Sequence, residues 1–349
     1  MFISYSIVNP LTLVRVPRRL PRPGEVLYRA GDSVEPAHIV AQAVDPPDFR
    51  IVDVARELDV PVKRVKNMLK VKEGATLKRG DVLAARGSFG GPVCRSPIEG
   101  VLVGSGRGRL LIEAGPGAIQ LSALVPGRVV ETWPEEGVMI ETVGAHIQAI
   151  WGNGKEAFGV LRVVVRAPRH PIRPKHIDPS LQGVILVGGS RIDEETLEHA
   201  IEAQVRGIIV GGVPPSLVPL LETLEFPVVC TEGLGVTPMS KAIFDLLRSL
   251  DGREAALCGR MQLRWGEERP YIVVPMPAQS GDPINPEEPL RVGGKVRILR
   301  GPYFGTSGTV VDIPPGMVQL ETGARLPGVE VDIGKETTLV PYINLERLL

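Results

Sequence analysis

Short hydrophobic stretches that alternate with polar residues and glycine turns dominate the first half of the chain. Residues 25–43 and 71–114 both show apolar pairs separated by glycine-containing turns, and residues 118–167 continue the pattern. This spacing predicts short β-strands joined by tight turns. We therefore expect a β-rich domain over residues 1–117 and a second β-rich module over residues 118–170, with a hairpin turn at Asn153 and Gly154.

Residues 49–70 show a different period. Apolar residues recur there at helical spacing, at Val54, Leu58, Val62, Val65 and Leu69. Pro61 divides the run, which predicts two short helices inserted into the first β-rich domain. Basic residues share one face of these helices: Lys63, Arg64, Lys66 and Lys70. That face either contacts nucleic acid, as in a helix-turn-helix, or is only solvated, and the second reading is the simpler one.

From residue 181 the pattern changes to strands that alternate with helices. Apolar strands are expected at 183–190, 207–213, 226–235 and 253–259, and helices at 193–204, 215–224 and 240–250. Continuously apolar strands connected through helices are typical of a parallel sheet buried on both faces. We expect a small parallel α/β domain over residues 181–277. Proline-rich segments at 168–180 and 278–289 are interpreted as linkers.

Loops rich in glycine follow three of these strands and form the best candidate pocket. In open α/β sheets, ligands bind beyond the carboxyl ends of the strands, and glycine N–H groups can approach an anion closely. The candidate ligand-binding residues are Gly188, Gly189, Ser190, Gly211, Gly212, Thr231, Glu232 and Gly233. The alternative is that these glycines only make tight turns, because no Walker or G-x-G-x-x-G motif is present.

Composition narrows the functional classes. The 349 residues are 43% hydrophobic and 23% charged, with a formal net charge of +0, which argues against general coating of nucleic acid but allows a local basic face. The 3 cysteines are far apart and the 5 histidines lack ligand spacing, so we expect neither disulfides nor a metal site. No catalytic cluster or cofactor motif is found, which favours a non-enzymatic protein without a cofactor. No signal peptide or membrane-length apolar run is found, so a cytoplasmic location without membrane contact is expected.

Two phrases within residues 71–114, GATLKRGDVLA and RSPIEGVLV, resemble the barrel-sandwich hybrid fold of biotinyl and lipoyl carrier domains. Carriers need an acceptor lysine at the hairpin tip between the two halves of the domain. Here the tip is GSFGG, residues 87–91, which contains no lysine. The resemblance therefore implies the fold and a scaffolding role, not a swinging-arm carrier.

GKVRILRGPYFGTSGTV (294–310) and VPYINLERL (340–348) resemble the KOW motif of NusG-type transcription elongation factors and of some ribosomal proteins. The resemblance implies an SH3-like barrel over residues 290–349 that contacts RNA, RNA polymerase or the ribosome. The candidate contact residues lie on the first strand and the loop after it: Arg297, Arg300, Tyr303 and Phe304. Acidic residues nearly balance the basic ones in this barrel, so we expect protein contact or a composite site more than tight RNA binding.

The sequence thus predicts a multidomain α+β protein. The expected function is a non-enzymatic adaptor whose KOW-like barrel docks on transcription or translation machinery or on RNA. The alternative is a sensor or enzyme for an anionic small molecule, with its site at the strand-end loops of the α/β domain.

Overall fold

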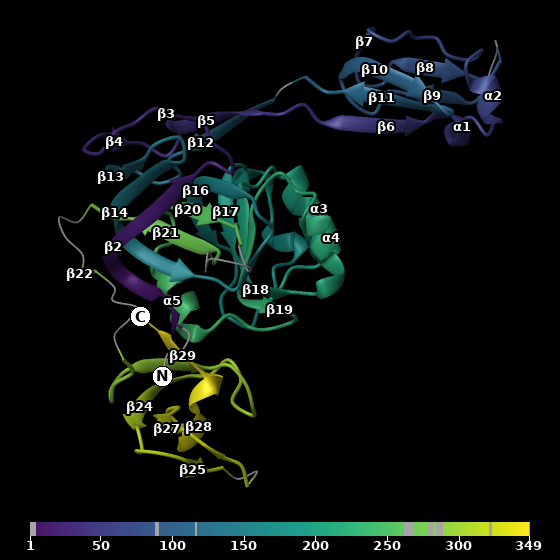
Figure 1. The fold of residues 1–349 in the computed structure, drawn as a ribbon. Coiled ribbons are helices and arrows are strands. Elements are labelled where there is room, and N and C mark those ends of the chain that lie inside the picture. Colours follow the sequence, from purple (N-terminus) through teal and green to yellow (C-terminus); the bar gives the residue numbers. More distant parts are fainter. Residues whose placement is uncertain are drawn as a thin grey trace.

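The computed structural model describes residues 5–87, 91–115, 117–261, 269–277, 282–283, 289–320 and 323–348. Strands predominate over helices, so the chain is a β-rich mixture of α and β structure. Figure 1 shows three parts: a central body, a distal module (residues 49–113) that stands apart from the body, and a C-terminal unit (residues 289–348) on the other side. None of the helices in the described ranges is long and apolar enough to cross a membrane.

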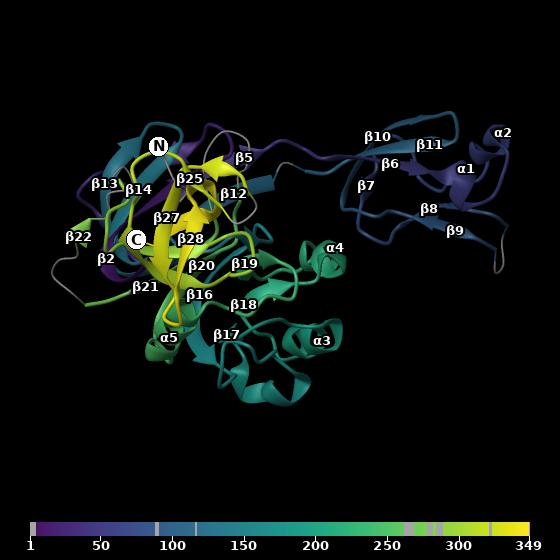
Figure 2. The same ribbon diagram turned by 90° about the horizontal axis from the view of Figure 1, so that it is seen from below.

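The distal module lies well separated from the central body, as Figures 1 and 2 show. Its strands are β6 (Phe49–Asp53), β7 (Thr76–Leu77), β8 (Val82–Ala85), β9 (Val93–Arg95), β10 (Gly100–Gly106) and β11 (Arg109–Glu113). Two short helices, α1 (Val54–Glu57) and α2 (Val62–Val65), lie on either side of Pro61 as predicted. The predicted helical insertion 49–70 nevertheless begins with a strand, because β6 pairs along its whole length with β11.

The strands before and after the distal module belong together. They are β2 (Val8–Arg19), β3 (Glu25–Val26), β4 (Ser33–Val34), β5 (Ile39–Asp45), β12 (Gly117–Ser122), β13 (Gly127–Trp133) and β14 (Gly137–Gln148). β12 pairs antiparallel with β5, and β14 pairs antiparallel with β2. The distal module is therefore inserted between two paired strands. The structure groups these residues differently from the predicted boundary at residue 117, since that boundary would separate strands that share hydrogen bonds.

The central body contains a mixed sheet that has 12 strands within the described residues. Four of them are parallel neighbours: β16 (Glu156–Val163), β17 (Val184–Val187), β18 (Gly207–Val213) and β19 (Val228–Leu234). Alternate residues of these strands pack against α3 (Glu194–Glu202) and α4 (Val218–Leu221) on one face and against α5 (Lys241–Ser249) on the other. Asp193 caps the start of α3, and Ser240 caps the start of α5.

Two details of this sheet differ from the prediction. The fourth predicted strand, β20 (Glu254–Cys258), is antiparallel to β16 and to β21 (Tyr271–Pro275), and β21 pairs with β14. The sheet of residues 181–277 is therefore continuous with the N-terminal strands and does not form a separate sheet. The predicted hairpin at Asn153 is also wrong: β15 (Trp151–Gly152) pairs with β19, whereas β16 pairs with β17 and β20.

The C-terminal unit holds a six-stranded sheet in the order β1-β29-β23-β24-β27-β28. These strands and the small hairpin beside them are β1 (Tyr5–Ser6), β23 (Lys295–Ile298), β24 (Ser307–Asp312), β25 (Val318–Gln319), β26 (Arg325–Leu326), β27 (Gly328–Asp332), β28 (Thr337–Pro341) and β29 (Leu345–Leu348). Its hydrophobic core contains Val296, Val310, Val331 and Leu345. The first strand of the chain runs parallel to the last, which ties the N-terminus to this unit.

The remaining short elements are 3-10 turns and one two-residue strand. The turns are η1 (Pro174–His176), η2 (Pro179–Leu181), η3 (Pro215–Leu217) and η4 (Tyr342–Asn344), and the strand is β22 (Asp282–Pro283), which pairs with β2. The predicted linker 168–180 therefore contains two turns of its own. It lies beside the end of β16, where it shapes a cavity described below.

Candidate functional site

Backbone N–H groups at the glycine-rich strand ends, the predicted anion site, already donate within the protein. The backbone N–H groups of Gly188, Gly189 and Ser190 donate to carbonyls of Ile209 and His170 at 2.8, 3.1 and 3.1 Å. Those of Gly211 and Gly212 donate to the carbonyls of Gly189 and Ser190, at 3.1 and 2.8 Å. These five donors are used within the protein, so they are not available to a bound anion.

Close packing explains why glycine stands at these positions. A Cβ atom at Gly189 would lie 2.5 Å from the carbonyl oxygen of Ala167, and one at Gly211 would lie 2.3 Å from that of Thr237. Gly233 is also buried, with φ +101°, and Thr231 is fully buried. The turn-making alternative therefore accounts for the glycines, and the ligand site on these loops stays a prediction.

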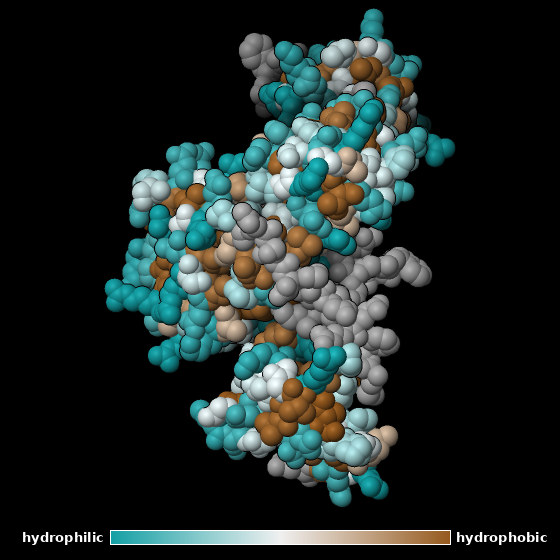
Figure 3. Space-filling model, turned by 90° about the vertical axis from the view of Figure 1, so that its left-hand side faces the viewer, coloured by the Kyte–Doolittle hydropathy of each residue, from teal (hydrophilic) through white to brown (hydrophobic). Residues whose placement is uncertain are grey.

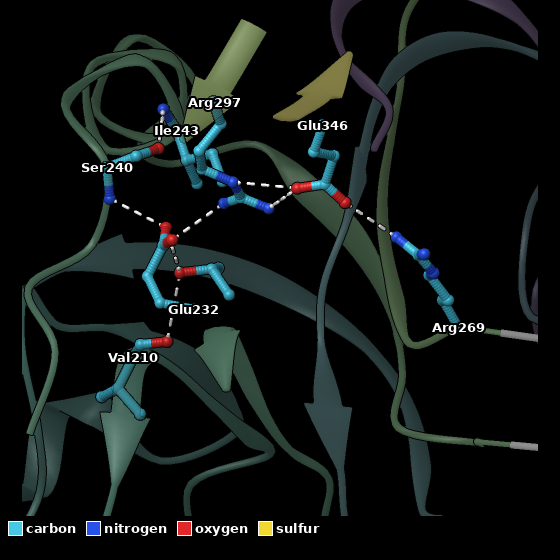
Figure 4. A network of polar contacts seen from close by, with 8 residues as sticks. Val210, Glu232, Ser240, Ile243, Arg269, Arg297 and Glu346 are labelled. Carbon is cyan, nitrogen blue, oxygen red and sulfur yellow. Dashed lines mark hydrogen bonds and ion pairs between the residues drawn. The ribbon is translucent and has the colours of Figure 1, made fainter. Parts of the chain in front are cut away.

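Glu232, the acidic residue of the predicted pocket, accepts hydrogen bonds from within the protein (Figure 4). Its Oε1 accepts the backbone N–H of Ser240 at 2.9 Å, at the start of α5, where the helix dipole favours a negative charge. Its Oε2 accepts Nη1 of Arg297 at 2.8 Å. Glu232 and Arg297 were predicted to serve two separate sites in two domains, and the structure brings them together across the junction between the central body and the C-terminal unit.

Arg297 lies at the centre of this network. Its Nε and Nη2 donate to Oε2 of Glu346 at 3.0 and 2.5 Å, and Oε1 of Glu346 accepts Nη1 of Arg269 at 3.0 Å. The side chains of Arg297 and Glu346 are each 2% exposed, and that of Glu232 is 5% exposed. Burial alone would lower the pKa of Arg297, but the charges of Glu232 and Glu346 outweigh it and raise that pKa. Arg297 is thus a buried tie between two parts of the molecule, and its predicted role as a surface contact is wrong.

The other candidate residues of the KOW-like loop lie nearer the surface. Arg300 is exposed and the side chain of Phe304 is 54% exposed. Tyr303 is half-buried against the core of the unit, and its hydroxyl donates to Oε1 of Glu336 at 2.8 Å. The loop is shaped by Gly301 and Gly305, which both have positive φ. Arg300 and Phe304 are therefore the members of the predicted contact set that a partner can reach directly.

A basic cavity of about 590 Å³, which we did not predict from the sequence, lies at the end of β16. Its lining residues are Val164, Val165, Arg166, His170, Pro171, Arg173, Lys175 and His176. The cavity lies on the predicted edge of the sheet, beside Gly188 and Gly189, but none of the predicted residues lines it. The cluster of basic residues in 166–176 could have indicated this cavity. We interpreted most of that segment as a linker because it is rich in proline.

Comparison with known proteins identifies no relative: no family model matches the chain, and no curated protein matches it. The hairpin-tip residues 88–90, which bear on the carrier-domain resemblance, lie outside the described residues.

Proposed function

We propose that the protein is a non-enzymatic adaptor whose C-terminal unit docks on transcription or translation machinery. The proposal starts from the resemblance of residues 294–310 and 340–348 to the KOW motif. It is supported by the surface of the unit, by its charge and by the way it is joined to the central body.

The observation that carries the proposal is the exposed hydrophobic surface of the C-terminal unit. Figure 3 shows hydrophobic side chains gathered on the face of this unit that is turned to the viewer. Independently of that view, Phe304 is 54% exposed and Ile343 is 75% exposed. A backbone hydrogen bond joins the two segments that carry these side chains: the N–H of Leu299 donates to the carbonyl of Asn344 at 2.8 Å. Larger apolar patches on a protein surface mark contact with another protein.

The charge of the unit favours a protein partner over RNA at this surface. Basic and acidic residues nearly balance between residues 289 and 348. One of the basic residues, Arg297, is buried against two carboxylates and cannot reach a phosphate group. A surface that neutralises few phosphates gains little from counterion release, so contact with RNA here would be weak. We therefore assign the loop around Phe304 to contact with a protein component.

The distal module supplies a second, electrostatic contact in this proposal. It contains 13 basic and 7 acidic residues, a net charge of +6 in a chain whose formal charge is +0. Lys63, Arg64, Lys66 and Lys70 are all exposed and make no ion pair within the described residues. A basic module held away from the body suits a nucleic-acid component of the same assembly, because the phosphate backbone dominates such binding.

The test is capture of RNA polymerase or ribosomal subunits by the tagged full-length protein, with and without nuclease. We expect capture that survives nuclease and is lost in the Arg300→Ala/Phe304→Ala variant. Tyr303 is left unchanged, because its hydroxyl and ring stabilise the loop. Arg325→Ala, an exposed arginine on β26 of the same unit, is the matched control and is expected to capture normally.

Two outcomes would overturn the assignment. Capture that disappears with nuclease would show that nucleic acid, and not a protein component, holds the complex together. Capture that the double variant retains would remove the loop from the docking surface.

A further inference from the structure

The basic cavity is built on a fixed piece of backbone. After β16, the N–H of Val164 donates to the carbonyl of Val187 at 3.0 Å, and that of Ile172 donates to the carbonyl of Arg191 at 2.9 Å. Ile172 is fully buried, and the carbonyl of His170 accepts from both Gly189 and Ser190. The segment that carries the cationic side chains is therefore anchored to the carboxyl edge of the sheet at several points. A site on such a framework loses little entropy when a ligand binds.

The lining of the cavity has one sign of charge. Five of the lining residues are basic or are histidines: Arg166, His170, Arg173, Lys175 and His176. No carboxylate is among the described lining residues, and Arg166, Arg173 and Lys175 form no ion pair with the described part of the chain. The buried Arg18 and Arg297 are, in contrast, both held by glutamates. Cations gathered in a concave site without acidic partners create a positive potential that attracts anions.

The positive potential of the cavity affects the pKa of His176. Its pKa is lowered, first by partial burial and then by the positive charges of Lys175, Arg173 and His170. Arg166 and three apolar residues also line the cavity. A bound anion would offset the neighbouring positive charges and would stabilise protonated His176.

We infer that this cavity binds a phosphorylated small molecule, with its phosphate groups among Arg166, Arg173 and Lys175. Guanidinium and ammonium groups form strong charge-assisted hydrogen bonds with phosphate oxygens. Val164, Val165 and Pro171 supply an apolar wall for the uncharged part of the ligand. A volume of about 590 Å³ is in the range of sites that hold molecules of nucleotide size. This inference is independent of docking by the C-terminal unit.

The test is calorimetric titration of the full-length protein with inorganic pyrophosphate, with adenosine 5′-diphosphate and with a short single-stranded RNA, at low ionic strength. We expect both small phosphates to bind and added salt to weaken their binding. Arg173→Ala/Lys175→Ala is expected to lose affinity for both by about tenfold or more. Arg169→Ala is the matched control, because Arg169 is an exposed arginine of the same segment that does not line the cavity.

A second measurement places the ligand in the cavity. We expect the NMR titration midpoint of the His176 ring to rise when pyrophosphate is bound. Both variants replace exposed side chains, so an unchanged melting temperature is expected to confirm that they fold.

Three results would overturn the inference. One is the absence of binding by pyrophosphate and adenosine diphosphate. Another is an equal loss of affinity in Arg169→Ala, which would indicate general attraction to the surface. The third is binding of RNA without binding of either small phosphate, which would make the cavity part of a nucleic-acid contact.

Discussion

Arg18 and Arg297 are both almost fully buried and both held by carboxylates, but they stabilise different boundaries. Arg18, on β2, donates to both oxygens of Glu156 at 2.7 and 2.8 Å and to the carbonyl of Ser122 at 2.8 Å, all within the central body. Arg297 belongs to the C-terminal unit and reaches Glu232 of the body. The same chemistry thus holds layers of one body together in the first case and joins two separate cores in the second.

This difference teaches that burial alone does not give the consequence of losing a buried charge. A charge left without its partner in a water-poor site is costly wherever it lies. Inside the body, an unpaired charge lowers the free energy of unfolding of the whole body, because the body unfolds cooperatively. At the junction, we expect that opening of the C-terminal unit would expose Glu232 to water and would limit the cost to that unit.

The largest effect is expected for Arg18→Met. The variant leaves Glu156 with Arg260 as its remaining described cationic partner, and it should lower the free energy of unfolding of the body by about 3–5 kcal/mol. Urea denaturation followed by circular dichroism measures this loss. Arg15→Met is the control. Arg15, on the same strand as Arg18, is exposed, and its pair with Glu141 of β14 should contribute less than about 1 kcal/mol. Equal losses in the two variants would contradict the special role of Arg18.

A smaller and more local effect is expected for Arg297→Met. Glu346 keeps Arg269, whereas Glu232 loses the guanidinium that it binds, so the C-terminal unit should open more easily. Hydrogen exchange should become faster in β23 and β24 and stay unchanged in β17 and β18. Lys295→Met, on the same strand but exposed, should leave both regions unchanged. Faster exchange throughout the central body would show that the junction is not a separate boundary.

The two networks also mark the limit of what the sequence predicts. Helices α3 and α5 and strand β18 lie within a residue or two of their predicted positions, because caps and apolar periodicity are local signals. Strand partners are not local. The pairing of β5 with β12 spans the whole distal module, and the direction of β20 depends on a neighbour, β21, that the prediction did not pair with it.

The candidate site shows the same limit. Arg297 and Glu232 are 65 positions apart, and each was a reasonable surface candidate by residue type. Only the fold shows that each one neutralises the other. The basic cavity was missed for the opposite reason: residues 166–176 contain its cations in sequence, but nothing local shows that Ile172 and His170 anchor them to a sheet edge.

Mild acid should lower the stability of the central body more than that of the C-terminal unit. His146, on β14, has its pKa lowered to about 4 by burial, and its ring lies edge-on to Tyr271. Because the unfolded chain takes up this proton more readily, the stabilising difference is present above pH 6.5 and is lost as the pH falls toward 4. The loss is at most about 3 kcal/mol. Residues 289–348 contain no histidine, so the unit has no matching change from histidine in this range.

Urea denaturation at pH 7, 5.5 and 4 measures this effect. His146→Leu should remove most of the pH dependence between 6.5 and 4 while preserving an apolar site. His199→Leu, at a position on α3, serves as the histidine control and should leave the dependence in place. A dependence that survives in His146→Leu would assign the acid sensitivity to other groups.

The smallest effect on stability is expected for Arg300→Ala, which completes the series of arginines. Arg300 is exposed, so its loss should change the free energy of unfolding by less than about 0.5 kcal/mol, within the range of ordinary surface substitutions. The same variant, combined with Phe304→Ala, is expected to lose the proposed docking. Thermal denaturation and partner capture on the same preparation measure both. A destabilised Arg300→Ala variant would mean that the loop packs as part of the unit, and any loss of capture would then follow from unfolding. An unchanged melting temperature with lost capture would instead show that Arg300 differs in role from Arg18 and Arg297. Those two arginines stabilise the fold, whereas Arg300 would contribute to a surface that contacts a partner.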